Sequence, residues 1–422
     1  MKSIKLNQTY DVLHFCTAGS VDDGKSTLIG RLLYDSKSVF EDQLASVKQI
    51  SNRRGLSQVD LSLLTDGLKD EREQGITIDV AYRYFATPKR KFIIADTPGH
   101  VQYTRNMVTG ASTSSLVLIL VDARKGIVEQ TTRHSFIASL LQIPHLVVCI
   151  NKMDLVGYDQ EVFEKIVSDF RDFAAKLDIQ DFHLIPISAL HGDNVVNRST
   201  QMDWYQGGTL LHTLENIPVA NDINLLDTRF PVQSVLRTNT ETHPDYRGYA
   251  GQLASGILRI KDKVTVLPSG LQTTVKSIWT PSGPVDEAFA PQSITLELND
   301  DIDISRGDMV VRVNNHPLVS QDIEAMICWL GNTPATIGSK YALQHTTKNA
   351  RVIIKAITYN IDIHTLQRVE NQQHLQTNDL ARVTLRITAP IFYDPYRKNR
   401  VTGSFILIEE GSNNTVAAGM II

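Results

Sequence analysis

The amino-acid sequence predicts a multidomain fold in which an α/β domain is followed by two β-barrel domains. Residues 11 to about 218 alternate strand-like and helix-like patterns, and a phosphate-binding loop motif follows the first strand. From about residue 219, Gly and Pro turns separate short β-rich runs that recur roughly every ten residues, a spacing typical of barrels. We therefore expect domains at 1–218, 219–316 and 317–422.

Hydrophobic periodicity predicts the individual elements of the first domain. The continuous apolar run 116–121 suits a parallel strand that is buried on both faces, whereas 79–85 alternates and predicts an edge strand. A helix is expected over 161–177. Strands are expected at 12–17, 79–86, 91–96, 115–122, 145–150 and 182–187, and in the barrels at 230–236, 263–267, 309–313, 323–330, 351–359, 380–388 and 404–409.

Composition limits the function classes. The 422 residues carry a formal net charge of −4, which gives no bulk attraction to nucleic acid. The longest wholly apolar run, 116–121, is too short to span a bilayer, and the N-terminal residues form no apolar signal segment. We expect neither nucleic acid nor membrane as a partner. The basic clusters 89–91 and 397–400 are interpreted as solvated turns.

The three cysteines, Cys16, Cys149 and Cys328, lie among strand-forming residues and form no C-x-x-C pair. Isolated cysteines in such runs are typical of buried free thiols. The sequence therefore favours a reducing, cytoplasmic location.

A phosphate-binding loop organises the first domain. Residues 19–26 fit G-x-x-x-x-G-K-[ST], with a strand-like run before them and a helical pattern after them. This context argues against a chance match in a Gly-rich turn. Backbone N–H groups of such a loop point at phosphate oxygens, Lys25 reaches the β- and γ-phosphates, and the Ser26 hydroxyl ligates Mg²⁺. The loop residues expected to bind nucleotide are Gly19, Ser20, Val21, Asp22, Asp23, Gly24, Lys25 and Ser26.

A second group of motifs follows later strands. After the 91–96 strand, the Asp96 carboxylate is expected to hold Mg²⁺ through water, and the Gly99 N–H to bond the γ-phosphate. After the 145–150 strand, the Asp154 carboxylate is placed to accept hydrogen bonds from guanine N1 and its 2-amino group, which adenine cannot offer. The residues expected to bind nucleotide here are Asp96, Thr97, Pro98, Gly99, His100, Asn151, Lys152, Met153, Asp154, Ser188, Ala189 and Leu190. Four motifs in this order predict a GTPase that uses GTP and Mg²⁺.

Catalysis is expected at Thr77, His100 and Lys25. Thr77 follows a long polar segment, roughly 35–75, and is expected to offer its hydroxyl to Mg²⁺ and its N–H to the γ-phosphate. His100 follows the 96–99 motif and is expected to orient the attacking water, with Lys25 compensating phosphate charge. The predicted metal ligands are Ser26, Thr77 and Asp96.

The stretches GSVDDGKST, REQGITID, DTPGH and NKMD, followed by two β domains, resemble the elongation-factor type of translational GTPases. Within that superfamily the sequence is most similar to the large GTP-binding subunits of sulfate adenylyltransferase, the CysN family. Asp79 to Phe85, Asp122 to Gly126, Arg247 to Gly251 and Asp303 to Asp308 also carry this similarity.

The resemblance implies a GTPase subunit whose GTP hydrolysis drives formation of adenosine 5′-phosphosulfate and pyrophosphate from ATP and sulfate. That chemistry is expected on a smaller, CysD-like ATP sulfurylase subunit, since this chain has no H-x-G-H-type motif. The resemblance also implies that Val21 and Ile76 form a hydrophobic gate that holds His100 away until the partner engages. Two residues depart from the family pattern, Val101 where Glu is usual and Lys261 where Gly is usual.

Two alternatives stay open. The first is an elongation-factor-like translational GTPase that binds aminoacyl-tRNA, which the shared architecture allows and the acidic charge balance and Asp23 disfavour. The second is a non-enzymatic module that holds GTP structurally, which the intact Thr77, Gly99 and His100 disfavour. Copurification discriminates the sulfate adenylyltransferase subunit, which should bring down a small nucleotidyltransferase, from the translational GTPase, which should bring down tRNA.

Overall fold

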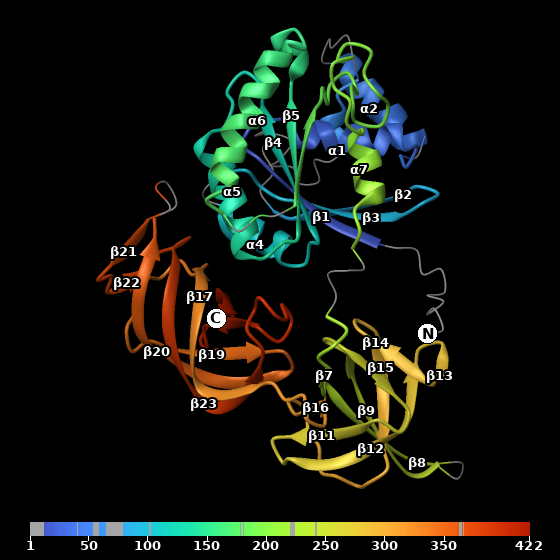
Figure 1. The fold of residues 1–422 in the computed structure, drawn as a ribbon, viewed down its shortest axis with the longest axis vertical. Helices are drawn as coiled ribbons and strands as arrows, with labels where there is room; N and C mark the ends of the chain where they lie inside the picture. Colours follow the sequence, from blue (N-terminus) through green and yellow to red (C-terminus); the bar gives the residue numbers. More distant parts are fainter. Residues whose placement is uncertain are drawn as a thin grey trace. The chain divides into compact units, whose positions relative to one another are not determined.

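The computed structural model divides into two compact units, residues 1–222 and 223–422. It describes residues 12–39, 41–53, 59–64, 79–100, 103–177, 179, 181–219, 224–240, 243–362, 365 and 367–422. Each unit is built around its own sheets (Figure 1).

The first unit is an α/β layer structure around a six-stranded sheet with the order β2-β3-β1-β4-β5-β6. Its strands are β1 Val12–Ala18, β2 Ala81–Ala86, β3 Lys91–Asp96, β4 Leu116–Asp122, β5 His145–Asn151 and β6 Phe182–Pro186. Its helices are α1 Lys25–Asp35, α2 Glu41–Arg53, η1 Leu61–Leu64, α4 Thr104–Ser112, α5 Glu129–Leu140, η3 Met153–Val156, α6 Gln160–Ala174 and α7 Leu210–Asn216.

The predicted parallel sheet and its edge strand are confirmed. Strands β3, β1, β4, β5 and β6 pair in parallel, so their carboxyl ends meet at one edge of the sheet. β2 alone pairs antiparallel, and it lies at the end of the strand order. Every residue of β4 and β5 is buried, which explains their continuous apolar sequence.

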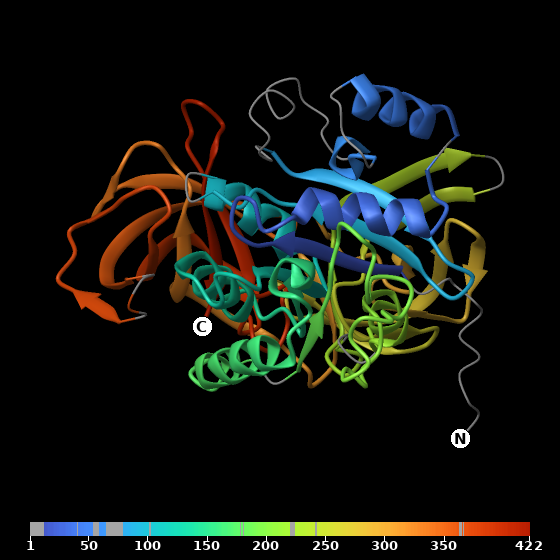
Figure 2. The same cartoon turned by 90° about the horizontal axis from the view of Figure 1, so that it is seen from above.

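Helices cover both faces of this sheet. Leu28 and Leu32 of α1 and Leu210 and Leu214 of α7 join one hydrophobic core with Leu118 of β4. α4 packs on the opposite face, where a Cβ on Gly110 would meet the Thr97 Cγ2 at 2.7 Å. α6 lies on the side of the sheet away from α1 in both views (Figures 1 and 2). The strand ends that carry the predicted motifs are therefore held by packing on two sides.

The second unit contains two β-barrels. The strands of the first are β7 Arg229–Pro231, β8 Ser234–Thr240, β9 His243–Gln252, β10 Ile257–Arg259, β11 Lys263–Leu267, β12 Leu271–Thr280, β13 Gly283–Val285, β14 Glu287–Phe289, β15 Ser293–Leu298 and β16 Met309–Arg312. The order β7-β16-β11-β12-β15-β9-β8 curls back on itself, because the Arg229 N–H bonds the Ser255 carbonyl and the Ala254 N–H bonds the Arg229 carbonyl.

The last barrel closes completely. Its strands are β17 Leu318–Trp329, β18 Ala335–Thr336, β19 Lys340–His345, β20 Lys348–Ile361, β21 Arg368–Glu370, β22 His374–Leu375, β23 Leu380–Tyr393, β24 Ser404–Ile408 and β25 Thr415–Ile421. The order β19-β24-β25-β17-β23-β20 becomes a ring because β19 also pairs with β20. β17, β20 and β23 run beyond the lengths predicted from the sequence.

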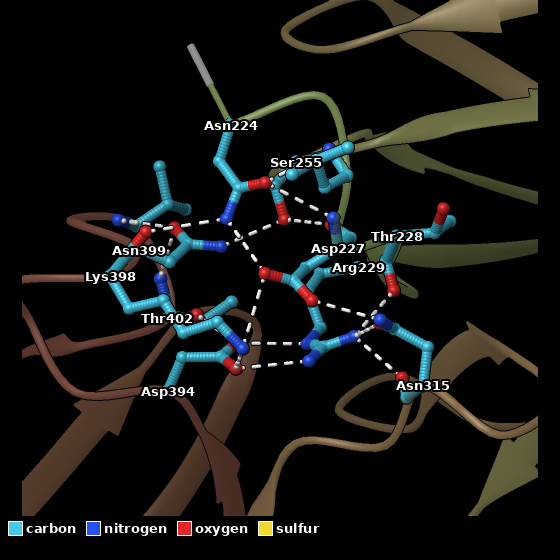
Figure 3. A network of polar contacts seen from close by, with 12 residues as sticks. Asn224, Asp227, Thr228, Arg229, Ser255, Asn315, Asp394, Lys398, Asn399 and Thr402 are labelled. Carbon is cyan, nitrogen blue, oxygen red and sulfur yellow. Dashed lines mark hydrogen bonds and ion pairs between the residues drawn. The ribbon is translucent and has the colours of Figure 1, made fainter. Parts of the chain in front are cut away.

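A buried polar network joins the two barrels (Figure 3). The Arg229 guanidinium donates two parallel hydrogen bonds to the Asp394 carboxylate, at 2.8 and 2.9 Å. Its Nη1 also donates to the Asn315 side-chain oxygen at 2.6 Å, and the Asn399 amide donates to the Ser255 hydroxyl at 2.8 Å. Paired in this way, a fully buried cation is stable between two β domains.

The basic clusters 89–91 and 397–400 are not simply solvated turns, so the interpretation from the sequence was wrong for both. Arg90 is 5% exposed and donates to the carbonyls of Leu214 and Ile217 at the end of α7. Asn399 is buried in the network between the barrels, and Lys398 forms an ion pair with Asp227 at 3.1 Å. Helix C-terminal carbonyls attract cations, which accounts for Arg90.

Candidate functional site

The phosphate-binding loop adopts a backbone that needs its glycines. It joins β1 to α1, as predicted, and Gly19, Asp22 and Gly24 have positive φ angles of 149°, 69° and 96°. A Cβ on Gly24 would also lie 2.5 Å from the Asn151 amide nitrogen. Backbone conformation and close contact therefore both require glycine at position 24.

Lys25 folds back across this loop. Its ammonium donates to the carbonyl oxygens of Gly19 at 3.0 Å and Ser20 at 2.9 Å, and the residue is 7% exposed. Burial lowers the pKa of Lys25, while the nearby Asp96 and Asp23 carboxylates oppose that shift. The loop thus holds a buried positive charge that, among the described residues, forms no direct ion pair.

Asp23 closes the loop on itself. Its carboxylate accepts a hydrogen bond of 2.6 Å from the Ser20 N–H, and the residue is almost fully buried. Burial raises the pKa of the Asp23 carboxyl, and the Ser20 hydrogen bond and the Lys25 charge act in the opposite direction. Asp23 therefore stabilises the turn of the loop through its hydrogen bond to Ser20.

The end of β3 lies against the loop. The Thr17 hydroxyl donates to Asp96 at 3.0 Å, and the Thr97 hydroxyl donates to the Thr17 carbonyl at 2.5 Å, so the ends of β1 and β3 are tied together. A Cβ on Gly99 would meet the Gly19 carbonyl oxygen at 2.2 Å and the Lys25 nitrogen at 2.5 Å. Only glycine allows this approach of the 96–99 segment to the loop.

His100 is the first exposed residue after this buried segment. Its ring centroid lies 6.1 Å from that of Tyr103, and its carbonyl accepts the Tyr103 N–H. Thr77 and Ile76, predicted as a catalytic and metal residue and as part of a gate, lie outside the described residues, as does Val101. Val21, the other predicted gate residue, is partly buried in the loop.

Asn151 connects the loop to the segment after β6. Its amide nitrogen donates to the Asp23 carbonyl at 2.7 Å, and its amide oxygen accepts the Ala189 N–H at 2.9 Å. Beside it, the Ser188 hydroxyl donates to the Asp154 carboxylate at 2.6 Å. The structure thus brings the 151–154 and 188–190 segments together at one end of the loop.

The remaining predicted residues beside Asn151 and Asp154 differ in their contacts and burial. Lys152 donates to the Asp22 carbonyl and pairs with Asp122 at 3.0 Å. Met153 is fully buried, and its N–H donates to the Ile187 carbonyl, so its side chain faces the core. Leu190 is 47% exposed, and its carbonyl accepts a hydrogen bond from Arg31.

Asp122 is a site residue to which the sequence reasoning assigned no role. Burial raises the pKa of its carboxyl, but hydrogen bonds from Arg124 and Lys152 outweigh burial and hold that pKa well below its usual range. The Arg124 guanidinium donates to both carboxylate oxygens, at 3.0 and 2.6 Å. The position of Asp122 at the carboxyl end of β4, next to the other motifs, is a signal that could have identified it.

Comparisons with known proteins show which families the parts of the chain match. Residues 10–232 match the elongation factor Tu GTP-binding domain family, and residues 322–422 match the GTP-eEF1A C-terminal domain-like family. The bifunctional enzyme CysN/CysC of Mycobacterium tuberculosis is 58% identical over 97% of this chain, which covers 67% of that enzyme. Sulfate adenylyltransferase subunit 1 of Bacteroides thetaiotaomicron is 53% identical over 98% of this chain, which covers 86% of that protein.

The chain belongs to the sulfate adenylyltransferase subunit 1 family. It carries a GTP-binding domain of the elongation factor Tu type. The solved Ski7 GTPase-like domain of S. cerevisiae, bound to GDP and inorganic phosphate, covers 98% of the chain with a TM-score of 0.52. At 19% identity, that likeness shows the fold alone. None of the described helices is long and apolar enough to cross a membrane.

Proposed function

We propose that this chain is the GTP-hydrolysing subunit of sulfate adenylyltransferase. Hydrolysis of GTP to GDP and phosphate drives the joining of ATP and sulfate into adenosine 5′-phosphosulfate and pyrophosphate on a smaller, CysD-like partner subunit. Two observations carry this proposal. Asn151 hydrogen-bonds the phosphate loop while Ser188 hydrogen-bonds the nearby Asp154, and the chain is 58% identical to a CysN/CysC enzyme. The buried thiols of the described cysteines fit a cytoplasmic enzyme.

Residues at the two ends of the site have separate tasks in this proposal. Loop N–H groups and Lys25 bind the phosphates, because the Lys25 ammonium forms no direct ion pair among the described residues and hydrogen-bonds two loop carbonyls. Asp154 accepts hydrogen bonds from the guanine N1 and 2-amino groups, and the segment 188–190 lies beside the guanine oxygen. Replacing Asp154 with Asn should shift preference toward xanthosine nucleotides, as measured by competition binding.

The residues fit Mg²⁺ as the metal. Ser26, Thr77 and Asp96 offer oxygen atoms, the ligand type that Mg²⁺ prefers, and Thr17 orients the Asp96 carboxylate at 3.0 Å. Bound there, the metal supplies positive charge to the phosphate oxygens.

The proposed domain boundaries remain 1–218, 219–316 and 317–422.

His100 is proposed to orient the attacking water, with Thr77 and Lys25 completing the catalytic set. Phosphoryl transfer needs mainly positioning, so His100 need not act as a full base. We propose that Val21 and Ile76 gate its approach, and that the partner subunit opens that gate. Replacing Val21 with Gly should therefore raise hydrolysis by the isolated chain and lower its coupling to product formation.

The test measures GTP hydrolysis and adenosine 5′-phosphosulfate formation with the smaller subunit, ATP and sulfate present or omitted. We expect slow hydrolysis by the chain alone and stimulation in the complete mixture. His100→Ala should keep GTP affinity and lose both activities together, whereas His374→Ala, at an exposed position in the last barrel, should lose neither. Equal hydrolysis with and without the partner would contradict coupling, and normal stimulated turnover in His100→Ala would leave His100 a packing residue.

A further inference from the structure

A buried carboxylate that the proposed chemistry does not use lies at the ends of β4 and β5. These two strands pair in parallel and end together, with Asp122 opposite Asn151 (Figure 1). Lys152 follows directly, and its ammonium pairs with the Asp122 carboxylate at 3.0 Å. The Asp122 side chain has no exposed surface, whereas the Lys152 side chain is 23% exposed. The pair therefore sits just inside the edge of the sheet from which the phosphate loop extends.

The oxygens of the Asp122 carboxylate are fully engaged by protein groups. One oxygen accepts the Arg124 backbone N–H and the Arg124 Nε–H, each at 3.0 Å. The other accepts the Arg124 Nη2–H at 2.6 Å and pairs with Lys152. An ionised carboxylate offers about four acceptor positions, so these contacts occupy it. Asp122 can therefore act on a bound nucleotide only through a neighbouring side chain.

Lys152 connects this carboxylate to the phosphate loop. Its ammonium donates to the Asp22 carbonyl, and the Asn151 amide donates to the Asp23 carbonyl at 2.7 Å. In a trans peptide the carbonyl and the following N–H point in opposite directions. Holding two successive carbonyls toward the end of β5 therefore directs the N–H groups that follow them into the loop. The Asp23 N–H accordingly meets the Ser20 carbonyl across the loop, at 3.3 Å.

The backbone is strained at both ends of the Lys152 contact. Asp22 and Lys152 have φ angles of 69° and 64°, which is the left-handed region that non-glycine residues rarely adopt. Such conformations persist only where surrounding contacts hold them. The Lys152 ammonium supplies a contact of this kind to the Asp22 carbonyl, and the Asp122 charge holds that ammonium in place.

We propose that Asp122 is a positioning residue for the nucleotide site, which holds the Lys152 ammonium on the Asp22 carbonyl and so keeps the phosphate loop in its binding conformation. The inference rests on the proposed function, because that function supplies the guanine nucleotide. Asp122 itself touches neither nucleotide nor metal. Its effect is to reduce the cost of ordering the loop when the phosphates bind.

The experiment measures how fast a fluorescent N-methylanthraniloyl-GDP leaves the full chain when unlabelled GDP is added in excess. Asp122→Asn removes the charge at nearly constant size and should speed dissociation on the order of tenfold, the size expected for a lost hydrogen bond to a charged group. Asp122→Glu keeps the charge and should recover part of the loss. Asp181→Asn, which alters a carboxylate paired with His145 at the opposite edge of the sheet, is the matched control and should stay within about twofold.

A double-mutant cycle tests whether the effect passes through Lys152. Lys152→Met removes the ammonium and leaves the pair of Asp122 with Arg124 in place, so it should also speed GDP dissociation on the order of tenfold. Adding Asp122→Asn to Lys152→Met should then change the rate by less than about twofold, because the contact is already lost. Fully additive effects would overturn the proposal. Should Asp122→Asn fail to fold, unchanged dissociation in Lys152→Met would overturn it.

The guanine 2-amino group separates this role from damage at Asp154. The ratio of GDP affinity to inosine diphosphate affinity reports that group, and it should stay within about twofold in Asp122→Asn. GTP turnover by the complete enzyme should show a raised KM and a nearly unchanged kcat. A changed ratio would overturn the proposal in favour of a disturbed base site. Unchanged GDP dissociation in Asp122→Asn would overturn this inference alone, whereas an unaltered chain that binds GDP no better than ADP would remove the proposed function and this inference with it.

Discussion

Lys25 and Arg229 are both buried cations, one in each unit, and they differ in the groups that satisfy them. Lys25 donates to two backbone carbonyls of its own loop. Arg229 donates to a carboxylate through two parallel hydrogen bonds and also to Asn315. Carbonyl oxygens and the nearby Asp96 and Asp23 carboxylates compensate the Lys25 charge only in part, whereas the Asp394 carboxylate pairs directly with Arg229. This difference indicates that Lys25 is available to bind an anionic ligand, whereas Arg229 joins the two barrels.

Removing the Arg229 side chain should give the largest effect. Arg229→Ala leaves Asp394 buried without its partner, so the unfolding free energy of the barrel unit should fall by about 3–5 kcal/mol. Urea denaturation followed by circular dichroism measures this. The double variant Arg229→Met with Asp394→Leu removes both charges and should recover most of the loss. A loss below about 1 kcal/mol in the single variant would contradict a structural role.

Lys25→Ala should act on chemistry and not on folding. GTP turnover should fall by about 10²- to 10³-fold, because a preorganised charge aimed at the phosphates is lost. The thermal midpoint without nucleotide should change little, since relief from burying the Lys25 charge offsets the loss of its two hydrogen bonds to loop carbonyls. Lys165→Ala, at an exposed position of α6, is the matched control. A drop in midpoint equal to that of Arg229→Ala would erase the contrast between the two cations.

His134 gives the first unit an acid sensitivity. Burial, followed by the charges of Lys25 and Arg133, lowers the pKa of His134 to about 3, from 6.5. Because the pKa of His134 is lower in the folded chain than in the unfolded chain, only the unfolded chain gains a proton between pH 6.5 and 3. The folded state therefore keeps its full stability above pH 6.5 and loses stability as pH falls toward 3. The unfolding free energy should fall by about 1.4 kcal/mol per pH unit in that window. His134→Leu should flatten this slope in acid titrations, and an unchanged slope would assign the sensitivity to other groups.

Lys261 should give the smallest effect. Its φ angle is 72°, a left-handed conformation that costs a non-glycine residue about 1–2 kcal/mol. Lys261→Gly should therefore raise the unfolding free energy by about 0.5–1 kcal/mol, after the entropy that glycine loses on folding. Lys261→Ala keeps the strain and should give no gain. Equal stability of all three chains would mean that the turn relaxes around the side chain.

Periodicity and turn residues were enough to predict the sheet, its edge strand and both barrels, because those signals are local in sequence. The phosphate loop was predictable for the same reason. The Arg229 and Asp394 pair could not be found in this way, since its members lie 165 positions apart. Arg90 looked like part of a solvated basic turn, and only the end of α7, more than 120 positions away, shows why it is buried.

The role of Asp122 was missed for a related reason. A carboxylate after a strand is expected to face a ligand, but Asp122 faces Arg124 and Lys152. Its sequence position placed Asp122 at the correct edge of the sheet. That position could not show which neighbouring side chains would hydrogen-bond its carboxylate oxygens. Pairing partners within a site follow from side-chain direction, which no linear pattern encodes.

The Asn151 amide has a thermodynamic consequence. It donates to the phosphate loop at Asp23 and accepts from Ala189 beside the proposed base position, so one planar group spans both halves of the site. Aspartate would lack the donor, and glutamine would be a methylene too long. Ordering either half therefore lowers the entropic cost of ordering the other, and such coupling is reciprocal. Guanosine and pyrophosphate, added as separate fragments, should each bind more tightly when the other is present.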